Sequence, residues 1–456
     1  MKLWIIISLT TMLQLSAYGQ GNETNQRSEK ASEAEKERIE ALRTEQRLKF
    51  EALMAQRRMN DSTDAANRLS GYYNNRRPDT LLTIDLHNCK LNELPGFVLE
   101  VTALTKLDIS GNSIEKLPRK LKRLDSLKEI RWMGNNLESL KIPKLKHLSR
   151  IKLRDNSLSA VKRLKKLPAV KEIDLSKNQI TGIPIKSLHK STRLHTLLLG
   201  ENPLTIGEGD YHKLKSLKVL KLNKCGLSSL HTDFTQLSGL NELQLQENQL
   251  STLPEGFSKM KALTKLSFYK NELTELPDDL FLIPNLQVID LYFNKLEKLP
   301  ATVGEAKKLG ILYLANNLIY DLHENIGALT DLEELYLHHN RLSYLPSSLE
   351  KLTKIRVLRV NHNRLTEFPV AIMNFSNLTD LDLNNNDIMV LPASIGELSN
   401  LRLFTFSNNP MNFNSPENQP FLAEVHKMIQ RGVICKPAIK TEYVNEDGES
   451  LESGLE

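Results

Sequence analysis

A pattern of leucines returns about every 23 residues through most of this chain, and no other feature restricts its fold as strongly. The copies align as LxxLxLxxNxLxxLP, and the interval is 23 residues except in three copies, where it is 21, 22 or 24. Position one of the pattern is occupied in fifteen successive copies by Leu81, Leu104, Leu127, Leu148, Val170, Leu194, Leu217, Leu240, Leu263, Leu286, Leu309, Leu332, Ile355, Leu378 and Leu401. A fixed period of this length is typical of solenoids, in which each copy is one structural unit.

Each copy has the pattern of a short strand followed by a tight turn. The segment LxLxx alternates apolar and polar residues, as a half-buried strand does. The apolar residues cannot be buried within one copy, so neighbouring copies must stack. Position nine holds Asn112, Asn135, Asn156, Asn178, Asn202, Asn248, Asn271, Asn294, Asn317, Asn340, Asn363, Asn386 and Asn409. A side-chain amide there can both donate to and accept from the backbone of the turn, so we expect a stacked column of asparagines.

A proline follows position fourteen in many copies and predicts how the chain returns to the next strand. It lacks an N–H and disfavours helix at the residue before it, so we expect an extended return path. The prolines are Pro95, Pro118, Pro254, Pro277, Pro300, Pro346, Pro369 and Pro392.

These copies resemble the leucine-rich repeat family over residues 81–411. The LP-containing form with 23 residues looks most like the Ras-binding scaffold proteins of that family and their bacterial relatives. The resemblance implies an α/β solenoid, a right-handed horseshoe with a parallel sheet on its concave side. The composition of residues 29–58 indicates that this horseshoe is preceded by a charged helix. Fifteen strands spaced about 4.8 Å apart would give a sheet about 70 Å long.

The cysteines depart from the clusters that flank the repeats in animal extracellular members of the family. Cys89 and Cys225 stand at position nine, six copies and roughly 30 Å apart, too far for a disulfide. We expect structural roles for both, and a place in the C-terminal cap for Cys435.

The first 19 residues have the pattern of a secretory signal peptide. Lys2 precedes an apolar run from Leu3 to Leu13, and Ala17 and Gly19 are spaced for cleavage before Gln20. An uncleaved anchor or a buried helix are the alternatives. Residues 20–77 are predicted to be a charged helical segment followed by a linker, because residues 29–58 are rich in Glu, Lys, Arg, Ala and Gln and residues 60–80 are polar.

Three further segments complete the predicted organisation. The repeat domain spans residues 78–411. Residues 412–440 are predicted to form a helical cap, in which an amphipathic helix between Pro416 and Gly432 places Phe421, Leu422, Val425 and Met428 on one face. Residues 441–456 have six acidic and no basic residues and predict a disordered tail.

Aromatic residues occupy repeat positions that the core does not need. Positions three, five, seven and eight point from the concave sheet towards solvent, and equivalent residues of adjacent strands lie about 4.8 Å apart. The register therefore predicts one contiguous patch of Tyr269, Tyr292, Phe293, Tyr313, Tyr336, His338, His339 and Arg359. Exposed aromatic residues with arginine are typical of protein-binding surfaces, so we expect a protein or peptide ligand here. The alternative is cross-strand pairing that only stabilises the sheet.

We find no sequence motif for catalysis and no requirement for a cofactor. The Walker A loop, GxSxG, HExxH, CxxC and GxGxxG are all absent. His338, His339 and His362 with Asp382 could bind zinc or copper, but exposed histidines are more often plain surface residues, and we predict no metal site.

Charge is distributed unevenly along the repeats. Residues 115–172 have 18 basic against 6 acidic residues, whereas residues 271–340 have 4 against 12. Arg131, Arg150, Lys152 and Arg154 fall at concave positions and could bind an anionic partner, although a solvated basic surface is the plainer interpretation. The net charge of +6 is too balanced to indicate nucleic acid, and no nucleic-acid partner is expected.

The sequence thus favours a non-enzymatic binding scaffold that uses its concave face and is exported to the periplasm or the cell exterior. A structural or self-assembling envelope protein is the alternative. An intracellular signalling scaffold is a third possibility if the signal peptide is not used. No apolar run in the sequence reaches the roughly 20 residues of a membrane-spanning helix.

Overall fold

The computed structural model describes residues 63–72, 80–161, 164, 167–436, 443–444 and 450–451. The chain divides into two compact units, Met1–Asn67 and Arg68–Glu456, and the second contains every repeat. The predicted signal peptide and the charged segment up to residue 62 lie outside the described residues, as does most of the predicted acidic tail.

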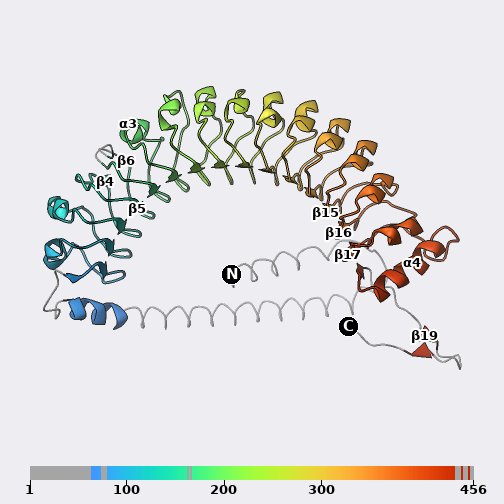
Figure 1. The fold of residues 1–456 in the computed structure, drawn as a ribbon, viewed down its shortest axis with the longest axis horizontal. Coiled ribbons are helices and arrows are strands. Elements are labelled where there is room, and N and C mark those ends of the chain that lie inside the picture. The colour runs from blue at the N-terminus through green and yellow to red at the C-terminus, as the bar shows by residue number, and fades with distance from the viewer. Residues whose placement is uncertain are drawn as a thin grey trace, which may run out of the picture. The chain divides into compact units, whose positions relative to one another are not determined.

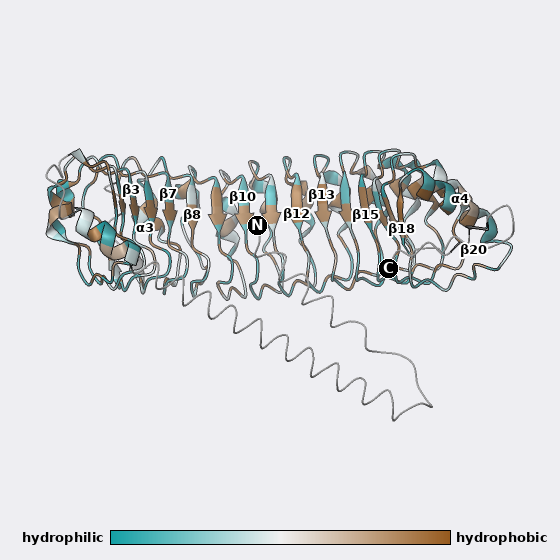
Figure 2. Cartoon of the chain, turned by 90° about the horizontal axis from the view of Figure 1, so that it is seen from below, coloured by the Kyte–Doolittle hydropathy of each residue, from teal (hydrophilic) through white to brown (hydrophobic). Residues whose placement is uncertain are grey.

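The repeats form a curved solenoid, and a parallel sheet lines its concave side (Figure 1). Among the described residues the sheet has sixteen strands, of which fifteen occupy positions three to five of the predicted repeats. Figure 2 shows these strands in a single row. They are β1 (Thr83–Asp85), β2 (Lys106–Asp108), β3 (Glu129–Arg131), β5 (Arg150–Lys152), β7 (Glu172–Asp174), β8 (Thr196–Leu198), β9 (Val219–Lys221), β10 (Glu242–Gln244), β11 (Lys265–Ser267), β12 (Val288–Asp290), β13 (Ile311–Tyr313), β14 (Glu334–Tyr336), β15 (Val357–Arg359), β16 (Asp380–Asp382), β17 (Leu403–Thr405) and β18 (Ile434–Lys436). The predicted α/β solenoid horseshoe is confirmed.

The convex side consists mainly of short 3₁₀ helices, so the expectation of an extended return path is wrong beyond the proline itself. Pro346, for example, is extended at φ −64° and ψ 144°, and the five residues after it form a 3₁₀ helix. The reason lies in the spacing of the buried residues Leu349, Leu352 and Ile355, which recur every three residues. That spacing matches the three residues per turn of a 3₁₀ helix.

The convex elements follow one another in the order of the repeats. They are η2 (Gly96–Glu100), η3 (Arg119–Arg123), α3 (Ile185–Leu188), η5 (Tyr211–Leu214), η6 (Thr232–Gln236), η7 (Phe257–Lys259), η8 (Asp278–Leu282), η9 (Ala301–Glu305), η10 (Glu324–Ala328), η11 (Ser347–Lys351), η12 (Val370–Asn374) and η13 (Ala393–Glu397). In two early repeats a two-stranded parallel sheet of β4 (Ser139–Leu140) and β6 (Ala160–Val161) also forms on this side.

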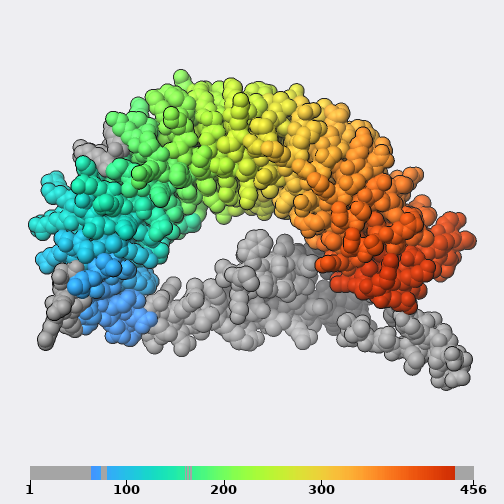
Figure 3. All heavy atoms as spheres, in the orientation of Figure 1, coloured from blue at the N-terminus to red at the C-terminus, as the bar shows by residue number. Residues whose placement is uncertain are grey.

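The core between the two sides is one continuous layer of leucines joined by the asparagine column. Asn294 donates from Nδ2 to the carbonyls of Phe268 at 3.1 Å and Leu291 at 3.0 Å, and its Oδ1 accepts from the amide of Leu273 at 3.1 Å. Its side chain thus connects two successive repeats. The space-filling view shows the repeats packed as one continuous arc (Figure 3).

Cys225 replaces asparagine in this column and performs only part of its role. Its thiol lies 3.4 Å from the carbonyl oxygen of Leu199, in the place of the amide donor. A thiol offers little as an acceptor, and the amide of Leu204 instead bonds to the backbone carbonyl of Cys225 at 3.2 Å. Burial raises the pKa of Cys225 to about 11. No disulfide joins the three cysteines, all of which lie among the described residues.

Both ends of the sheet are covered by segments outside the regular repeat. Residues 63–72 form a helix, inside the stretch for which the sequence predicts a linker, and residues 68–72 of it belong to the same compact unit as the sheet. Tyr72 packs against the core, and its hydroxyl accepts from the amide of Asp85 at 2.9 Å. The composition of this segment does not predict such a tertiary contact.

At the other end, α4 (Gln419–Gln430) lies within the stretch for which the sequence predicts a helix. Phe421 packs edge-on against Phe406, with ring centroids 5.2 Å apart. The chain then adds β18 beside β17, a sixteenth strand that the sequence does not predict. In the predicted acidic tail, β19 (Tyr443–Val444) pairs with β20 (Ser450–Leu451).

Candidate functional site

The eight residues predicted to form a concave patch lie together on strands β11 to β15 and in the turns that follow these strands. Tyr313, Tyr336 and Arg359 end three adjacent strands and are paired in register. Tyr269, Tyr292 and His338 each stand two residues beyond a strand end. Phe293 and His339 come one residue later. Ring contacts join these side chains into one cluster, which we call the concave aromatic patch.

A stack of two tyrosines and an arginine forms the centre of the patch. The rings of Tyr313 and Tyr336 are 4.8 Å apart and inclined by 16°. The guanidinium carbon of Arg359 lies 6.0 Å from the Tyr336 ring centroid, within the range of a cation–π contact. Arg359 also donates to Asp380 at 3.0 Å, so its charge is held in place on the sheet.

A second row runs along position seven. Tyr269 and Tyr292 have ring centroids 6.0 Å apart. The Tyr292 hydroxyl and His338 Nε2 are hydrogen-bonded at 2.9 Å although they are two repeats apart. The intervening residue at this position is Ala315, whose small side chain is buried and leaves room for that contact.

Position eight has a left-handed backbone throughout the solenoid, and three aromatic rings occupy it within or beside the patch. Phe293, His339 and His362 have φ values of 54°, 54° and 55°, whereas Gly111 occupies the same position in an early repeat. A bulky side chain is unfavourable at positive φ, so Phe293 introduces local strain. Phe293 is also 42% exposed, so the strained side chain is offered to solvent rather than used in the core.

Burial governs the ionisation of the patch. It lowers the pKa of His338 to about 4, with the neighbouring His339, Arg359 and His362 acting in the same direction. Burial also lowers the pKa of His339 and of His362. These imidazoles are therefore predominantly neutral at pH 7, and the patch is an aromatic surface rather than a cationic one.

The same histidines do not assemble into a metal site. His339 and His362 stack face to face, with centroids 4.0 Å apart, instead of directing their nitrogens to a common point. In the part of the chain that the structure describes, no group of three or more His, Cys, Asp or Glu residues is placed to hold a metal ion.

The four predicted basic residues also lie together, but neighbouring carboxylates pair with all of them. Arg131 and Arg150 share Glu129, which is 8% exposed in its side chain. Burial alone would raise the pKa of Glu129, but hydrogen bonds and charges from Arg131 and Arg150 hold it below its ordinary value. Lys152 lies 3.8 Å from Glu172, and Arg154 is paired with Glu201. The excess of basic residues counted from the sequence therefore overstates the unpaired positive charge that these residues present to a partner.

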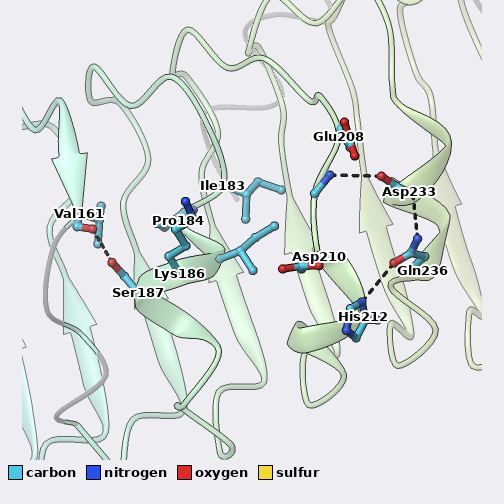
Figure 4. A pocket seen from close by; sticks show the side chains of 12 residues that line it. Val161, Ile183, Pro184, Lys186, Ser187, Glu208, Asp210, His212, Asp233 and Gln236 are labelled. Atoms are coloured by element: carbon cyan, nitrogen blue, oxygen red, sulfur yellow. Dashed lines mark hydrogen bonds between the residues drawn. The ribbon is translucent and has the colours of Figure 1, made fainter.

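A cavity that the sequence analysis does not predict opens between α3 and η5 (Figure 4). Its volume is 690 Å³, and Ile183, Pro184 and Glu208 contribute to its wall. Some of its polar groups bond to one another, since Asp233 accepts from Gln236 at 2.8 Å and from the amide of Gly209 at 3.3 Å. One feature of the sequence could have indicated this cavity: the segment from Pro203 to Asp210, where the repeat lacks the usual Leu-Pro ending.

Comparisons with known proteins agree with the repeat assignment. Family models described as leucine-rich repeat match residues 215–268, 307–365 and 377–398. An uncharacterised leucine-rich repeat-containing protein of Schizosaccharomyces pombe is 28% identical over 130 residues, which is 27% of this chain and 21% of that protein. A leucine-rich repeat serine/threonine-protein kinase of Caenorhabditis elegans is 29% identical over 92 residues, 19% of this chain and 4% of the kinase. The matches thus span about a fifth or less of these relatives.

Solved structures match over more of the chain. A leucine-rich repeat protein of Leptospira interrogans is 26% identical with a TM-score of 0.65, covering 79% of this chain and 97% of that one. The plant peptide hormone receptor RGFR1, in complex with RGF2, is 26% identical with a TM-score of 0.54, covering 73% of this chain and 60% of the receptor. Among the described residues, we find no helix with the length and apolar character needed to cross a membrane.

Proposed function

This chain belongs to the leucine-rich repeat family, and from that premise we propose that it is a non-enzymatic scaffold that binds a protein or peptide on its concave face. The ligand contacts the concave aromatic patch. The observation that carries the proposal is the contiguous surface of partly exposed aromatic side chains, with the strained, exposed Phe293 at its edge. Aromatic residues and arginine on a rigid surface give affinity at a low cost in side-chain entropy.

Two features favour binding over a purely structural role for these residues. The core is already filled by positions four and six of every repeat, so the tyrosines are not needed to bury apolar surface. Strain retained at an exposed residue is typical of functional sites. The similar receptor RGFR1 was solved in complex with RGF2, which supports a protein or peptide as the class of ligand.

The proposal places the protein outside the cytoplasm, in the periplasm or the cell exterior, because residues 1–19 have the pattern of a signal peptide. An anionic partner for the basic residues is a weaker proposal, since carboxylates pair with Arg131, Arg150, Lys152 and Arg154. If it exists, its affinity should fall steeply as salt is added.

Affinity capture from an envelope extract of the producing organism tests the main proposal. The mature protein is compared with a variant in which Tyr292, Tyr313 and Tyr336 are alanine. The control variant has Tyr320→Ala and Tyr344→Ala, two tyrosines that are 49% and 54% exposed and lie outside the patch. We expect a partner that both the wild type and the control retain and the patch variant loses. A partner that all three proteins retain would place binding elsewhere.

A second variant separates binding from folding. Phe293→Asn restores a residue type that the left-handed position accepts easily, as Asn316 does in the next repeat. For this variant we expect an unchanged or higher free energy of unfolding and a lower affinity for the partner. Loss of self-association with unchanged partner capture would instead favour the alternative of a self-assembling envelope protein.

A further inference from the structure

Asp290 stands out among the carboxylates of the patch because no cation is paired with it in the described part of the chain. Asp380 is paired with Arg359, and Glu334 lies 3.0 Å from Arg356. Asp290 instead accepts from the amide of Tyr292 at 3.1 Å and from the Ser267 hydroxyl at 2.9 Å. Each carboxylate oxygen therefore keeps a further lone pair available.

Aromatic residues are the neighbours of this carboxylate along its own chain and on the next strand. Asp290 ends β12, and the strand register places it directly between Ser267 on β11 and Tyr313 on β13. Tyr292 follows it by two residues, and the rings of Tyr292 and Tyr269 are 6.0 Å apart. The faces of such rings carry partial negative charge, so the rings and the carboxylate attract the same kind of group.

The basic residues nearest in the register do not neutralise Asp290. Lys270 lies 3.6 Å from Glu247, on the opposite side from β12. Lys265 begins β11 beside Val288 rather than beside Asp290, and among the described residues no ion pair joins it to Asp290. Burial raises the pKa of Asp290, which reflects the cost of holding a carboxylate away from water without a counter-ion. An external cation would remove that cost.

We propose that the ligand of the concave patch inserts a cationic side chain, the ammonium of lysine or the guanidinium of arginine, between Asp290 and the rings of Tyr269, Tyr292 and Tyr313. This inference rests on the proposed function and specifies the chemistry of the partner. The cation donates hydrogen bonds to Asp290 and lies against the tyrosine rings. The acidic excess of residues 271–340, with 12 acidic against 4 basic residues, attracts such a partner to this part of the solenoid.

Two small probes that differ mainly in charge test the proposal without knowledge of the natural ligand. They are N-acetyl-lysine N′-methylamide and its neutral analogue N-acetyl-norleucine N′-methylamide, observed by saturation-transfer NMR on the full-length protein. For the wild type we expect the lysine probe to bind at least about threefold more tightly than the norleucine probe, with saturation strongest on its terminal methylenes. Equal or tighter binding of norleucine would overturn the proposal.

Substitution of two matched carboxylates completes the test. In Asp290→Asn the amide keeps the acceptor for the Tyr292 N–H, so the fold should be retained, and we expect the lysine probe to fall to the level of norleucine. Asp382→Asn is the control, because Asp382 ends β16 beside Arg359 and likewise accepts from a backbone amide, that of Asn384, at 3.0 Å. It should leave both probes unchanged. A lysine preference that survives Asp290→Asn, or is lost equally in Asp382→Asn, would overturn the assignment.

The captured partner distinguishes failure of this inference from failure of the proposed function. If capture depends on Tyr292, Tyr313 and Tyr336 but not on Asp290, the binding face stands and the cation site is wrong. If capture depends on neither, both proposals are wrong. If it depends on both, the same cation should be found by replacing lysines and arginines of the partner one at a time.

Discussion

Single asparagine side chains join the repeats, and Asn294 offers the clearest test of their contribution. Asn294→Ala leaves the carbonyls of Phe268 and Leu291 and the amide of Leu273 without this partner in a buried turn. We expect a loss of about 3 kcal/mol in the free energy of unfolding. Asn294→Cys should lose less, because Cys225 shows that a thiol can replace the donor. Equal losses for alanine and cysteine in urea titrations would contradict this account.

The ionisation of His338 predicts how stability depends on pH. Its pKa is lowered from 6.5 to about 4 in the folded protein, so the unfolded chain binds a proton more readily than the folded one. The contribution of His338 to the free energy of unfolding is therefore fully present above pH 6.5. It falls by on the order of 2 kcal/mol as the pH drops from 6.5 to about 4. Below pH 4 its contribution changes no further.

His338→Gln removes the titrating group while keeping a partner for the Tyr292 hydroxyl. We expect the melting temperature of this variant to depend less on pH between 6.5 and 4 than that of the wild type. His339 and His362 remain in both proteins, so their contribution cancels in the comparison. Parallel pH profiles for the two proteins would show that His338 does not titrate as the structure indicates.

The strands and their order were predictable from the repeat period, whereas several individual elements were not. Position three to position five is a strand in all fifteen repeats, because the alternation and the stacking require it. The proline after position fourteen predicts an extended path, but the three-residue spacing of buried side chains such as Leu349 and Leu352 determines the 3₁₀ helices that follow it. Strand β18 follows α4 and has no repeat pattern, so only its pairing with β17 identifies it.

The composition of the patch was likewise predictable, but its internal contacts were not. The register alone places Tyr313 beside Tyr336. The bond from Tyr292 to His338 skips a repeat and depends on the small side chain of Ala315 between them. The pairing of Arg131 and Arg150 with Glu129 depends on side-chain conformations that a charge count does not contain.

Packing between neighbouring 3₁₀ helices sets a limit on side-chain size that two matched glycines can test. A Cβ on Gly327, in η10, would overlap the backbone carbonyl of Ser348 in η11. Gly396 stands at the same repeat position in η13, but there the added atom would meet the flexible side chain of Glu424. We expect Gly327→Ala to cost about 2 kcal/mol and Gly396→Ala to be nearly neutral. Similar unfolding midpoints for the two variants would contradict this.

Across the molecule, most contacts between repeats join direct neighbours, although the bond from Tyr292 to His338 skips one repeat, so stability should be approximately a sum of local terms. This architecture fixes the concave patch on a rigid sheet while the ends carry no part of it. The ends must instead prevent exposure of the last apolar layer. At the C-terminal end, Phe421, Val425 and Met428 of α4 are buried, and Phe421 lies against Phe404 and Phe406.

Damage to this end should therefore spread only a short distance along the solenoid. Phe421→Ala removes a fully buried ring, and we expect a local loss of about 3–5 kcal/mol. Hydrogen exchange should accelerate in β16 and β17 and remain unchanged in β2 and β3, because the intervening repeats retain their own contacts. Ile429→Ala, on the same helix but 38% exposed, is the control and should change neither region. Uniform acceleration from β2 to β17 would show instead that the repeats unfold as a single cooperative unit, and that the patch depends on the cap for its rigidity.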